Sequence, residues 1–122
     1  MQKYITTPIY YLNGLPHIGH AYTSILGDVM KKFEQMRGNG VYYTTGTDEH
    51  GQKIENLAQK AGITPKEYVD GIAGQIRGIW DLMDADYDYF IRTTDDYHCA
   101  AVQKIFKTMY EKGDIYKGTY KG

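Results

Sequence analysis

The sequence contains a single cysteine, Cys99, so its 122 residues cannot form an internal disulfide or a Cys-x-x-Cys zinc site. It has no apolar run of the about 18 residues that a membrane-spanning helix needs, and no secretory leader is visible. The net charge is −1 without any basic block, so charge gives no indication of a nucleic-acid partner. We therefore expect a cytoplasmic protein without a membrane partner.

Several common chemical motifs are also missing. The sequence has no Gly-x-x-x-x-Gly-Lys-Ser/Thr phosphate loop, no Gly-x-Gly-x-x-Gly and no His-Glu-x-x-His, and it contains no internal repeat. Its hydrophobic content of 42% is sufficient for a globular core. A chain of this length forms at most one small domain, so residues 1–122 are not expected to contain a second one.

Residues 4–11 are rich in β-branched and aromatic side chains, a composition that predicts a strand. Pro8 has no backbone N–H to donate, so we expect the strand to end early and its backbone to bend toward a ligand. Asn13-Gly14 and Pro16 predict a turn, after which a helix begins. This stretch therefore predicts a strand, a tight turn and a helix in that order.

His17, Gly19 and His20 lie at the expected start of this helix. The first turn of a helix presents unpaired N–H groups and the positive end of the helix dipole, which suits a polyphosphate. Two imidazoles three residues apart share a face and can donate charge-assisted hydrogen bonds to phosphate oxygens, while a glycine lets a ligand approach the backbone. Two alternatives stay open: histidines without a function, or half of a metal site, although no third ligand lies nearby.

Residues 18–37 have the periodicity of an amphipathic helix that ends at residues 38–40. Lys31 is expected on the solvent face of this helix or at the edge of that face, and Asp28 close to the apolar stripe without an assigned role. The face expected to be buried consists of Tyr22, Ile25, Leu26, Val29, Met30 and Phe33.

Residues 41–45 predict a second strand, so the chain begins with a strand–helix–strand unit. Such a unit pairs its strands in parallel through a right-handed crossover, which predicts an α/β fold with a parallel sheet and flanking helices. Ligands of these sheets bind at the carboxyl ends of the strands. Residues 8–20 follow the first strand and residues 46–51 follow the second, so we expect both blocks to meet at one edge.

The second block, Gly46-Thr47-Asp48-Glu49-His50-Gly51, carries three ionisable side chains between two glycines. One interpretation is a polar loop that caps the next helix, with Asp48 as its N-cap. The other is a binding site, because a carboxylate at the end of a strand is well placed to bind a substrate ammonium.

The rest of the sequence predicts helices at 51–61 and 64–83, a strand at 87–92, a helix from about 95 to 112 and a strand at 115–120. Residues 81–88 carry four aspartates, but a Ca²⁺ loop would also need a glycine and a closing glutamate, so we expect a solvated connection. The last helix is expected to bury Val102, Ile105, Phe106, Met109 and Tyr110.

Three blocks of the sequence together resemble those of a known family. His17-Ile18-Gly19-His20 matches the HIGH motif of class I aminoacyl-tRNA synthetases, a motif that related nucleotidyltransferases share. Thr6-Thr7-Pro8-Ile9-Tyr10-Tyr11-Leu12-Asn13-Gly14 and residues 46–51 are similar to blocks of the methionyl-tRNA synthetases. The HIGH motif alone is weak, whereas the three blocks in this order are specific.

The resemblance covers about residues 4–122 and implies the N-terminal, HIGH-motif half of a Rossmann-like catalytic domain. The implied activity is that of a methionine–tRNA ligase. It activates methionine with ATP and Mg²⁺ to give methionyl-adenylate and pyrophosphate, and then transfers methionine to tRNA(Met).

The same resemblance implies roles for individual residues. The residues implied for ATP binding are His17, Gly19 and His20, of which the two histidines are also catalytic. The residues implied for methionine binding are Pro8, Ile9, Tyr11 and Asp48, the last holding the α-ammonium group. No metal ligand and no zinc site are expected within this chain, so Mg²⁺ is expected to arrive with ATP.

The sequence also departs from the family pattern, which includes an inserted connective domain, a Lys-Met-Ser-Lys-Ser-like loop, a zinc knuckle and an anticodon-binding domain. We therefore expect a fragment that ends near the start of the insertion, exposes part of its core and has little activity alone. Most contacts to tRNA are expected outside it. The alternatives are another synthetase or nucleotidyltransferase with the same histidine pair, and a non-catalytic module that binds a nucleotide or a partner.

Overall fold

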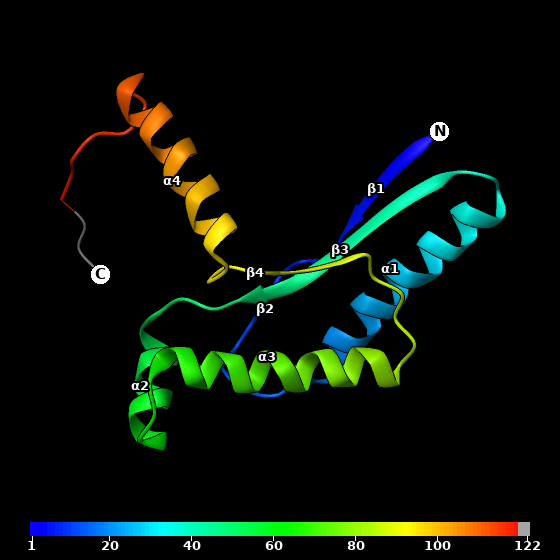
Figure 1. The fold of residues 1–122 in the computed structure, drawn as a ribbon, viewed down its shortest axis with the longest axis horizontal. Helices are drawn as coiled ribbons and strands as arrows, with labels where there is room; N and C mark the ends of the chain where they lie inside the picture. Colours follow the sequence, from blue (N-terminus) through cyan, green and yellow to red (C-terminus); the bar gives the residue numbers. More distant parts are fainter. Residues whose placement is uncertain (120–122) are drawn as a thin grey trace.

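A four-stranded parallel sheet organises residues 1–119, the part of the chain that the computed structural model describes (Figure 1). The strands are β1 (Gln2–Thr6), β2 (Tyr10–Tyr11), β3 (Gly40–Asp48) and β4 (Tyr89–Arg92). The helices are α1 (Ile18–Met36), α2 (Gln52–Ala61), α3 (Pro65–Leu82) and α4 (Asp96–Glu111). These elements confirm the predicted α/β fold with a parallel sheet and flanking helices.

β3 lies in the middle of the sheet. Thr44 is paired with Thr6 of β1 and with Tyr89 of β4, and Thr47 is likewise paired with β2 and β4. β1 and β2 therefore lie along the same side of β3, and β4 lies along the other side. All of these pairings are parallel, as a strand–helix–strand unit requires.

The strand predicted at residues 4–11 is divided at Pro8. In the register of the sheet, the three residues 7–9 oppose the two residues 45–46 of β3. This extra residue is a β-bulge, and a bulge tolerates a proline because it takes the missing N–H out of the ladder. The prediction that the first strand ends early at Pro8 is confirmed, but β2 then resumes the pairing.

Helices α1 and α3 lie on the same side of the sheet, and the core lies between them and the strands (Figure 1). Tyr10 links the two helices, because its hydroxyl bonds Ser24 of α1 at 2.8 Å and its ring packs edge-on against Trp80 of α3. The buried cluster consists of Tyr10, Leu12, Ile54, Val69, Ala73, Ile76, Trp80, Ala85 and Phe90. Four of these residues, Val69, Ala73, Ile76 and Trp80, come from α3.

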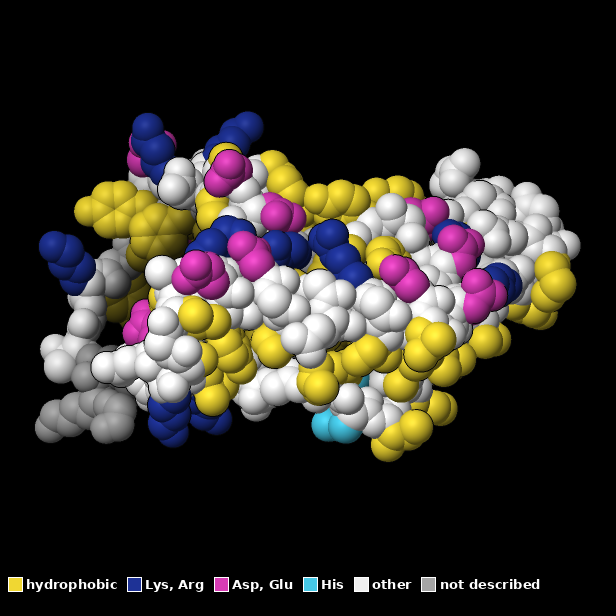
Figure 2. All heavy atoms as spheres, turned by 60° about the horizontal axis from the view of Figure 1, so that its bottom comes forward, with side chains coloured by type: hydrophobic (Ala, Val, Ile, Leu, Met, Phe, Trp, Pro, Cys, Tyr) yellow, Lys and Arg dark blue, Asp and Glu magenta, His cyan; other side chains and the backbone are white. Residues whose placement is uncertain are grey.

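Helix α1 confirms the predicted helix but turns its other face toward the sheet. Its buried residues are Ser24, Gly27, Asp28 and Lys31. A Cβ atom at Gly27 would come within 2.7 Å of the Tyr43 ring, so the helix approaches the sheet through small side chains. The six residues predicted to be buried, from Tyr22 to Phe33, are each at least 43% exposed. Figure 2 shows hydrophobic side chains along the lower border of the molecule, beside a histidine.

Lys31 was expected on the solvent face of α1 or at the edge of that face, and this prediction is wrong, because its side chain is only 3% exposed. Its ammonium group pairs with Asp86 at 3.1 Å and with Asp88 at 2.9 Å. Asp88 also accepts the N–H of Tyr43 at 2.6 Å, and Asp28 accepts the N–H of Asp86 at 3.0 Å. The segment between α3 and β4 is therefore tied to both α1 and β3, more closely than a solvated connection would be.

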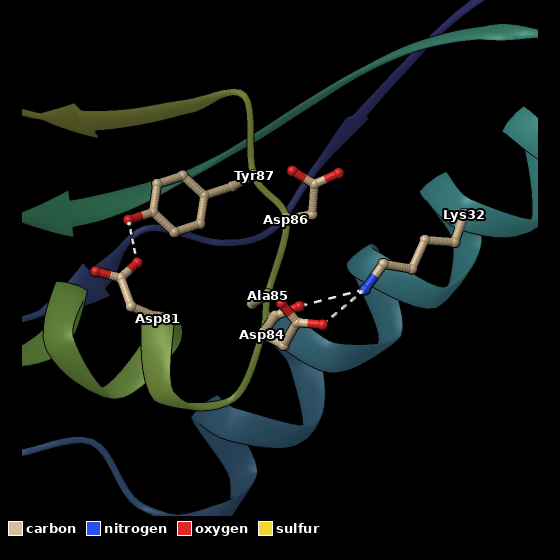
Figure 3. Close-up of a pocket in the computed structure, with 6 residues that line it drawn as sticks. All are labelled: Lys32, Asp81, Asp84, Ala85, Asp86 and Tyr87. Carbon is tan, nitrogen blue, oxygen red and sulfur yellow. Dashed lines mark hydrogen bonds and ion pairs between the residues drawn. The ribbon is translucent and has the colours of Figure 1, made fainter.

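A hollow of about 540 Å³ lies beside this segment (Figure 3). Lys32 of α1 points into it toward Asp84, and the Tyr87 hydroxyl bonds Asp81 at 3.3 Å. Within residues 1–119, no group of three or more His, Cys, Asp or Glu side chains is arranged to hold a metal ion. The hollow is thus an acidic surface feature remote from the carboxyl ends of the strands.

Helix α4 confirms the last predicted helix, but none of its residues is buried. The five residues expected on its core face are between 42% and 60% exposed. The strand predicted at 115–120 is wrong over residues 115–119, which have no regular structure, and Tyr120 lies outside the described residues. None of the helices within residues 1–119 combines the length and apolar character needed to cross a membrane.

Candidate functional site

The start of α1 is capped by its own two histidines. His17 is the N-cap residue, and its Nδ1 atom accepts the N–H of Gly19 at 3.1 Å. The Nδ1 atom of His20 accepts the N–H of His17 at 3.1 Å, which completes a capping box. The two rings stack with their centroids 3.9 Å apart. Imidazoles here do what Ser or Thr and Glu do in an ordinary capping box.

These capping bonds determine which nitrogen can face a ligand. Because each Nδ1 atom accepts a backbone N–H, the proton of each neutral ring lies on Nε2. The pKa of His20 is lowered below its ordinary value by partial burial and, secondarily, by repulsion from His17. His20 is therefore a neutral donor at neutral pH, and a bond from its Nε2–H to an anionic phosphate oxygen would still be charge-assisted.

The geometry of the cap explains why position 19 is a glycine. A Cβ atom at this position would lie 3.0 Å from Cε1 of His17, so the stacked ring occupies the space beside the glycine. The sequence predicted that Gly19 gives a nucleotide access to the backbone, and this role stays a prediction.

Asp48 is the last residue of β3 and is half-buried. Its carbonyl oxygen accepts the N–H of Leu12 at 3.3 Å, which places its backbone beside the end of β2. Within residues 1–119, no hydrogen bond or ion pair engages its carboxylate. The block predicted as a loop thus begins in the strand, and the N-cap of α2 is Gly51 rather than Asp48.

The neighbouring carboxylate, Glu49, is fully occupied. Its side chain is 0% exposed and forms a two-pronged ion pair with Arg92 at the end of β4 (Nε to Oε1 2.7 Å, Nη2 to Oε2 2.9 Å). The hydroxyl of Thr47 donates to Oε1 at 2.6 Å, and the hydroxyl of Thr94 donates to Oε2. Arg92 continues the network to Asp70 of α3 at 2.6 Å.

Sequence reasoning gave Glu49 and Arg92 no role. A signal for them was present, because Arg92 ends a predicted strand at the same edge of the sheet as residues 46–51. The pKa of Asp70 is lowered by its hydrogen bond with Lys66 and, to a smaller extent, by its hydrogen bond with Arg92. Arg92 is thus held between two carboxylates from different elements.

The two predicted blocks lie next to each other. The ring of Tyr10 contacts the ring of His20 with centroids 5.1 Å apart, and Tyr10 is paired with Thr47, the residue before Asp48. Tyr11 is paired with Asp48 itself. The sequence-based expectation that topology brings the helix start and the end of β3 to one edge agrees with this arrangement.

The other residues implied for methionine binding lie around the bulge. Pro8 and Ile9 are exposed between β1 and β2, while Tyr11 is half-buried. The Tyr11 hydroxyl lies 2.7 Å from the position that a Cβ atom at Gly51 would occupy, so a side chain at Gly51 would have to displace it. Gly51 also has a φ of 132°, which favours glycine.

A parallel sheet whose first strands lead through a His-Ile-Gly-His turn into a helix places this chain among the class I aminoacyl-tRNA synthetases. The family model described as "tRNA synthetases class I (M)" matches residues 3–122. The chain belongs to this family of methionine-type synthetases.

Individual relatives are similar over the whole chain. A methionine–tRNA ligase of Caldanaerobacter subterraneus subsp. tengcongensis is 57% identical over 119 residues, which are 98% of this chain and 19% of that protein. One from Helicobacter pylori is 55% identical over 100% of this chain and 19% of its own length. The chain thus spans about a fifth of these curated relatives.

A solved structure has the same fold. The Mycobacterium tuberculosis methionyl-tRNA synthetase in complex with methionyl-adenylate superposes with a TM-score of 0.95 at 36% identity. The match covers 99% of this chain and 24% of that one. The Rossmann-like character expected from the resemblance is thereby confirmed.

Proposed function

We propose that this chain carries part of the active site of a methionine–tRNA ligase. In the first reaction the carboxylate of methionine attacks the α-phosphorus of ATP, and pyrophosphate leaves to give methionyl-adenylate. In the second a ribose hydroxyl of tRNA(Met) attacks the acyl carbon, and AMP leaves. Neither step needs a protein nucleophile, so the chain contributes positioning and charge stabilisation.

The helix start is proposed to act on ATP. His17 and His20 donate their Nε2–H groups to phosphate oxygens, and this contact strengthens as charge develops at the α-phosphate in the transition state. Gly19, between them, has no side chain and is proposed to let the nucleotide approach the first turn of α1.

The end of β3 is proposed to act on methionine. Asp48 binds the α-ammonium group through a charge-assisted hydrogen bond. Pro8, Ile9 and Tyr11 line the space for the side chain, where apolar and aromatic groups suit a thioether. The observation that carries the proposal is the free carboxylate of Asp48 at the same edge of the sheet as the helix start.

Mg²⁺ is proposed to enter as its complex with ATP, held mainly by phosphate oxygens, because the donor groups within residues 1–119 do not form a cluster for the ion. Contacts with tRNA(Met) are proposed to lie mostly outside this chain, whose net charge is −1. A cytoplasmic location follows from this role in protein synthesis.

Calorimetric titration of the chain with a methionyl-adenylate analogue, the methionyl sulfamoyl-adenosine, tests this proposal. We expect binding, and we expect Asp48→Asn to weaken it at least about tenfold, since hydrogen bonds to charged groups contribute about 1.5–3 kcal/mol. Asp114→Asn, which changes an exposed aspartate beyond α4, is the matched control and leaves affinity unchanged.

Other outcomes point to the alternatives. Equal affinity for sulfamoyl-adenosines of several amino acids would show that the site is not specific for methionine and accepts a broader class of amino acids. Binding of ATP that ignores the aminoacyl group would indicate a nucleotide-binding module. A folded chain that binds no analogue would refute the proposal that these residues form a working part of the site.

A further inference from the structure

Glu49 lies immediately beside Asp48 but makes quite different contacts. Each of its carboxylate oxygens accepts two hydrogen bonds, one from Arg92 and one from a threonine hydroxyl. Its acceptor capacity is thereby taken up, and its side chain is 0% exposed. Glu49 cannot bind a ligand in this state, so any contribution to binding has to act through a neighbouring residue.

The backbone on both sides of Asp48 is fixed by the segment that follows β4. Thr93 donates its N–H to the carbonyl oxygen of Thr47 at 3.3 Å, and its hydroxyl accepts the N–H of Glu49 at 2.8 Å. The carbonyl oxygen of Thr93 lies 3.1 Å from Nε2 of His50. Asp48 lies between these two anchored residues, and its own carbonyl oxygen accepts the N–H of Leu12 at 3.3 Å, so only its side chain is without a partner within residues 1–119.

Side chains of successive strand residues point to opposite faces. Thr47 of β3 is paired with Tyr10, whose side chain contacts α1 and α3, and the Thr47 hydroxyl bonds Glu49 on that face at 2.6 Å. Asp48, the next residue of β3, is directed to the opposite face. Anchoring Glu49 therefore fixes which way the Asp48 carboxylate points.

A purely stabilising role gives a poor account of this arrangement. Replacing a buried ion pair by apolar residues of similar volume is often neutral or favourable for stability. A two-pronged guanidinium–carboxylate pair does, however, define direction and distance much better than apolar contacts do. The pair is suited to holding a backbone in register.

We propose that Glu49, held by Arg92, is a positioning residue that directs the Asp48 carboxylate at the ammonium group of the amino-acid substrate. This inference rests on the proposed function and deepens it. The pair touches no substrate, and its effect is specific to ligands that carry the ammonium group.

The test compares two ligands in calorimetric titrations of the chain: the methionyl sulfamoyl-adenosine and the same compound with hydrogen in place of its α-amino group. Glu49→Gln keeps the size of the side chain and removes its charge. We expect it to weaken binding of the amino compound about tenfold and to leave the desamino compound unchanged, a size typical of coupling between neighbouring residues. In an Asp48→Asn background, Glu49→Gln has no further effect.

Two further variants complete the design. Asp70→Asn removes the other partner of Arg92 and is the matched control, with an unchanged preference for the amino compound. Arg92→Lys keeps the charge but loses the two-pronged geometry, so we expect the same selective loss of affinity for the amino compound. This variant serves as the test if circular dichroism shows that Glu49→Gln does not fold.

Equal weakening of both compounds by Glu49→Gln, or effects that add fully to Asp48→Asn, would overturn the positioning role while leaving the proposed function intact. Failure of the unaltered chain to bind either compound would overturn both.

Discussion

The two blocks that meet at the edge of the sheet are held in opposite ways. The start of α1 is held by bonds within four residues, between His17, Gly19 and His20, and its rings remain accessible. The end of β3 is held by Arg92 and Thr93, more than forty residues later in the chain. The first block is thus a local structure, whereas the second exists only when β4 has docked.

This contrast predicts that remote substitutions damage the end of β3 but spare the start of α1. The largest effect is expected for Arg92→Met, which leaves the buried Glu49 carboxylate without its cation. Breaking a buried pair in this way costs about 3–5 kcal/mol. Urea unfolding followed by circular dichroism measures the loss. The double variant Glu49→Met with Arg92→Met should recover part of the stability, and a double variant as unstable as Arg92→Met alone would contradict the account.

A somewhat smaller effect is expected for Gly46→Ala. A Cβ atom at Gly46 would lie 2.0 Å from the carbonyl oxygen of Ile91, so β3 and β4 must separate to admit it. Overpacking of this kind costs about 3 kcal/mol. Gly71→Ala is the matched control, because Gly71 lies in α3 with open space around it and should gain roughly 0.5–1 kcal/mol in helix stability. Equal unfolding midpoints for the two variants would show that β3 and β4 have room to move.

The start of α1 should respond only to local changes. His17→Ala removes the acceptor for the Gly19 N–H, and loss of an N-cap costs about 1 kcal/mol. His17→Asn retains a capping acceptor and should restore most of that stability in the same urea experiment. If both variants lose the same amount of stability, the imidazole has a structural role beyond the cap.

The smallest effect concerns the protonation of His20. Its pKa should lie below the ordinary value of 6.5 because of partial burial and the nearby His17, and NMR titration of the imidazole resonances measures it. Replacing His17 by Asn should raise the pKa only in part, since burial is the larger cause. A lowered folded-state pKa means that protonation favours unfolding. The stability that His20 contributes is therefore present above pH 6.5 and is lost as the pH falls through the folded-state pKa. A His20 pKa above 6.5 would contradict this.

Local signals predicted most of the secondary structure. The sequence itself marks the start of α3 by the capping box of Thr64 and Glu67 and the proline at the first helical position, and it marks the end of α2 by Gly62. The helix start at His17 was equally visible, because turn residues and periodicity are properties of neighbouring residues. The bulge was visible only as a proline in a strand.

Burial was predicted less well, for a physical reason. Periodicity shows that one face of α1 is apolar, but it does not show which face meets the sheet. Tyr43 reaches across to α1 and bonds the carbonyl oxygen of Ser24 at 3.0 Å, so the helix needs Gly27 and not a leucine at the contact. Lys31 can be buried because its ammonium group bonds Asp88, which lies more than fifty residues later in the chain. Such pairs have no local signal.

The separation of Glu49 from Arg92 by 43 residues also has a consequence for the timing of synthesis. The helix start can take its form as soon as the residues of α1 have left the ribosome. The end of β3 has to wait until Arg92 and Thr93 emerge, which at about 5–20 residues per second is a delay of a few seconds. During that interval the Glu49 carboxylate is hydrated and Asp48 has no fixed direction. The nascent chain thus forms the block proposed to bind phosphate before the block proposed to bind the amino acid.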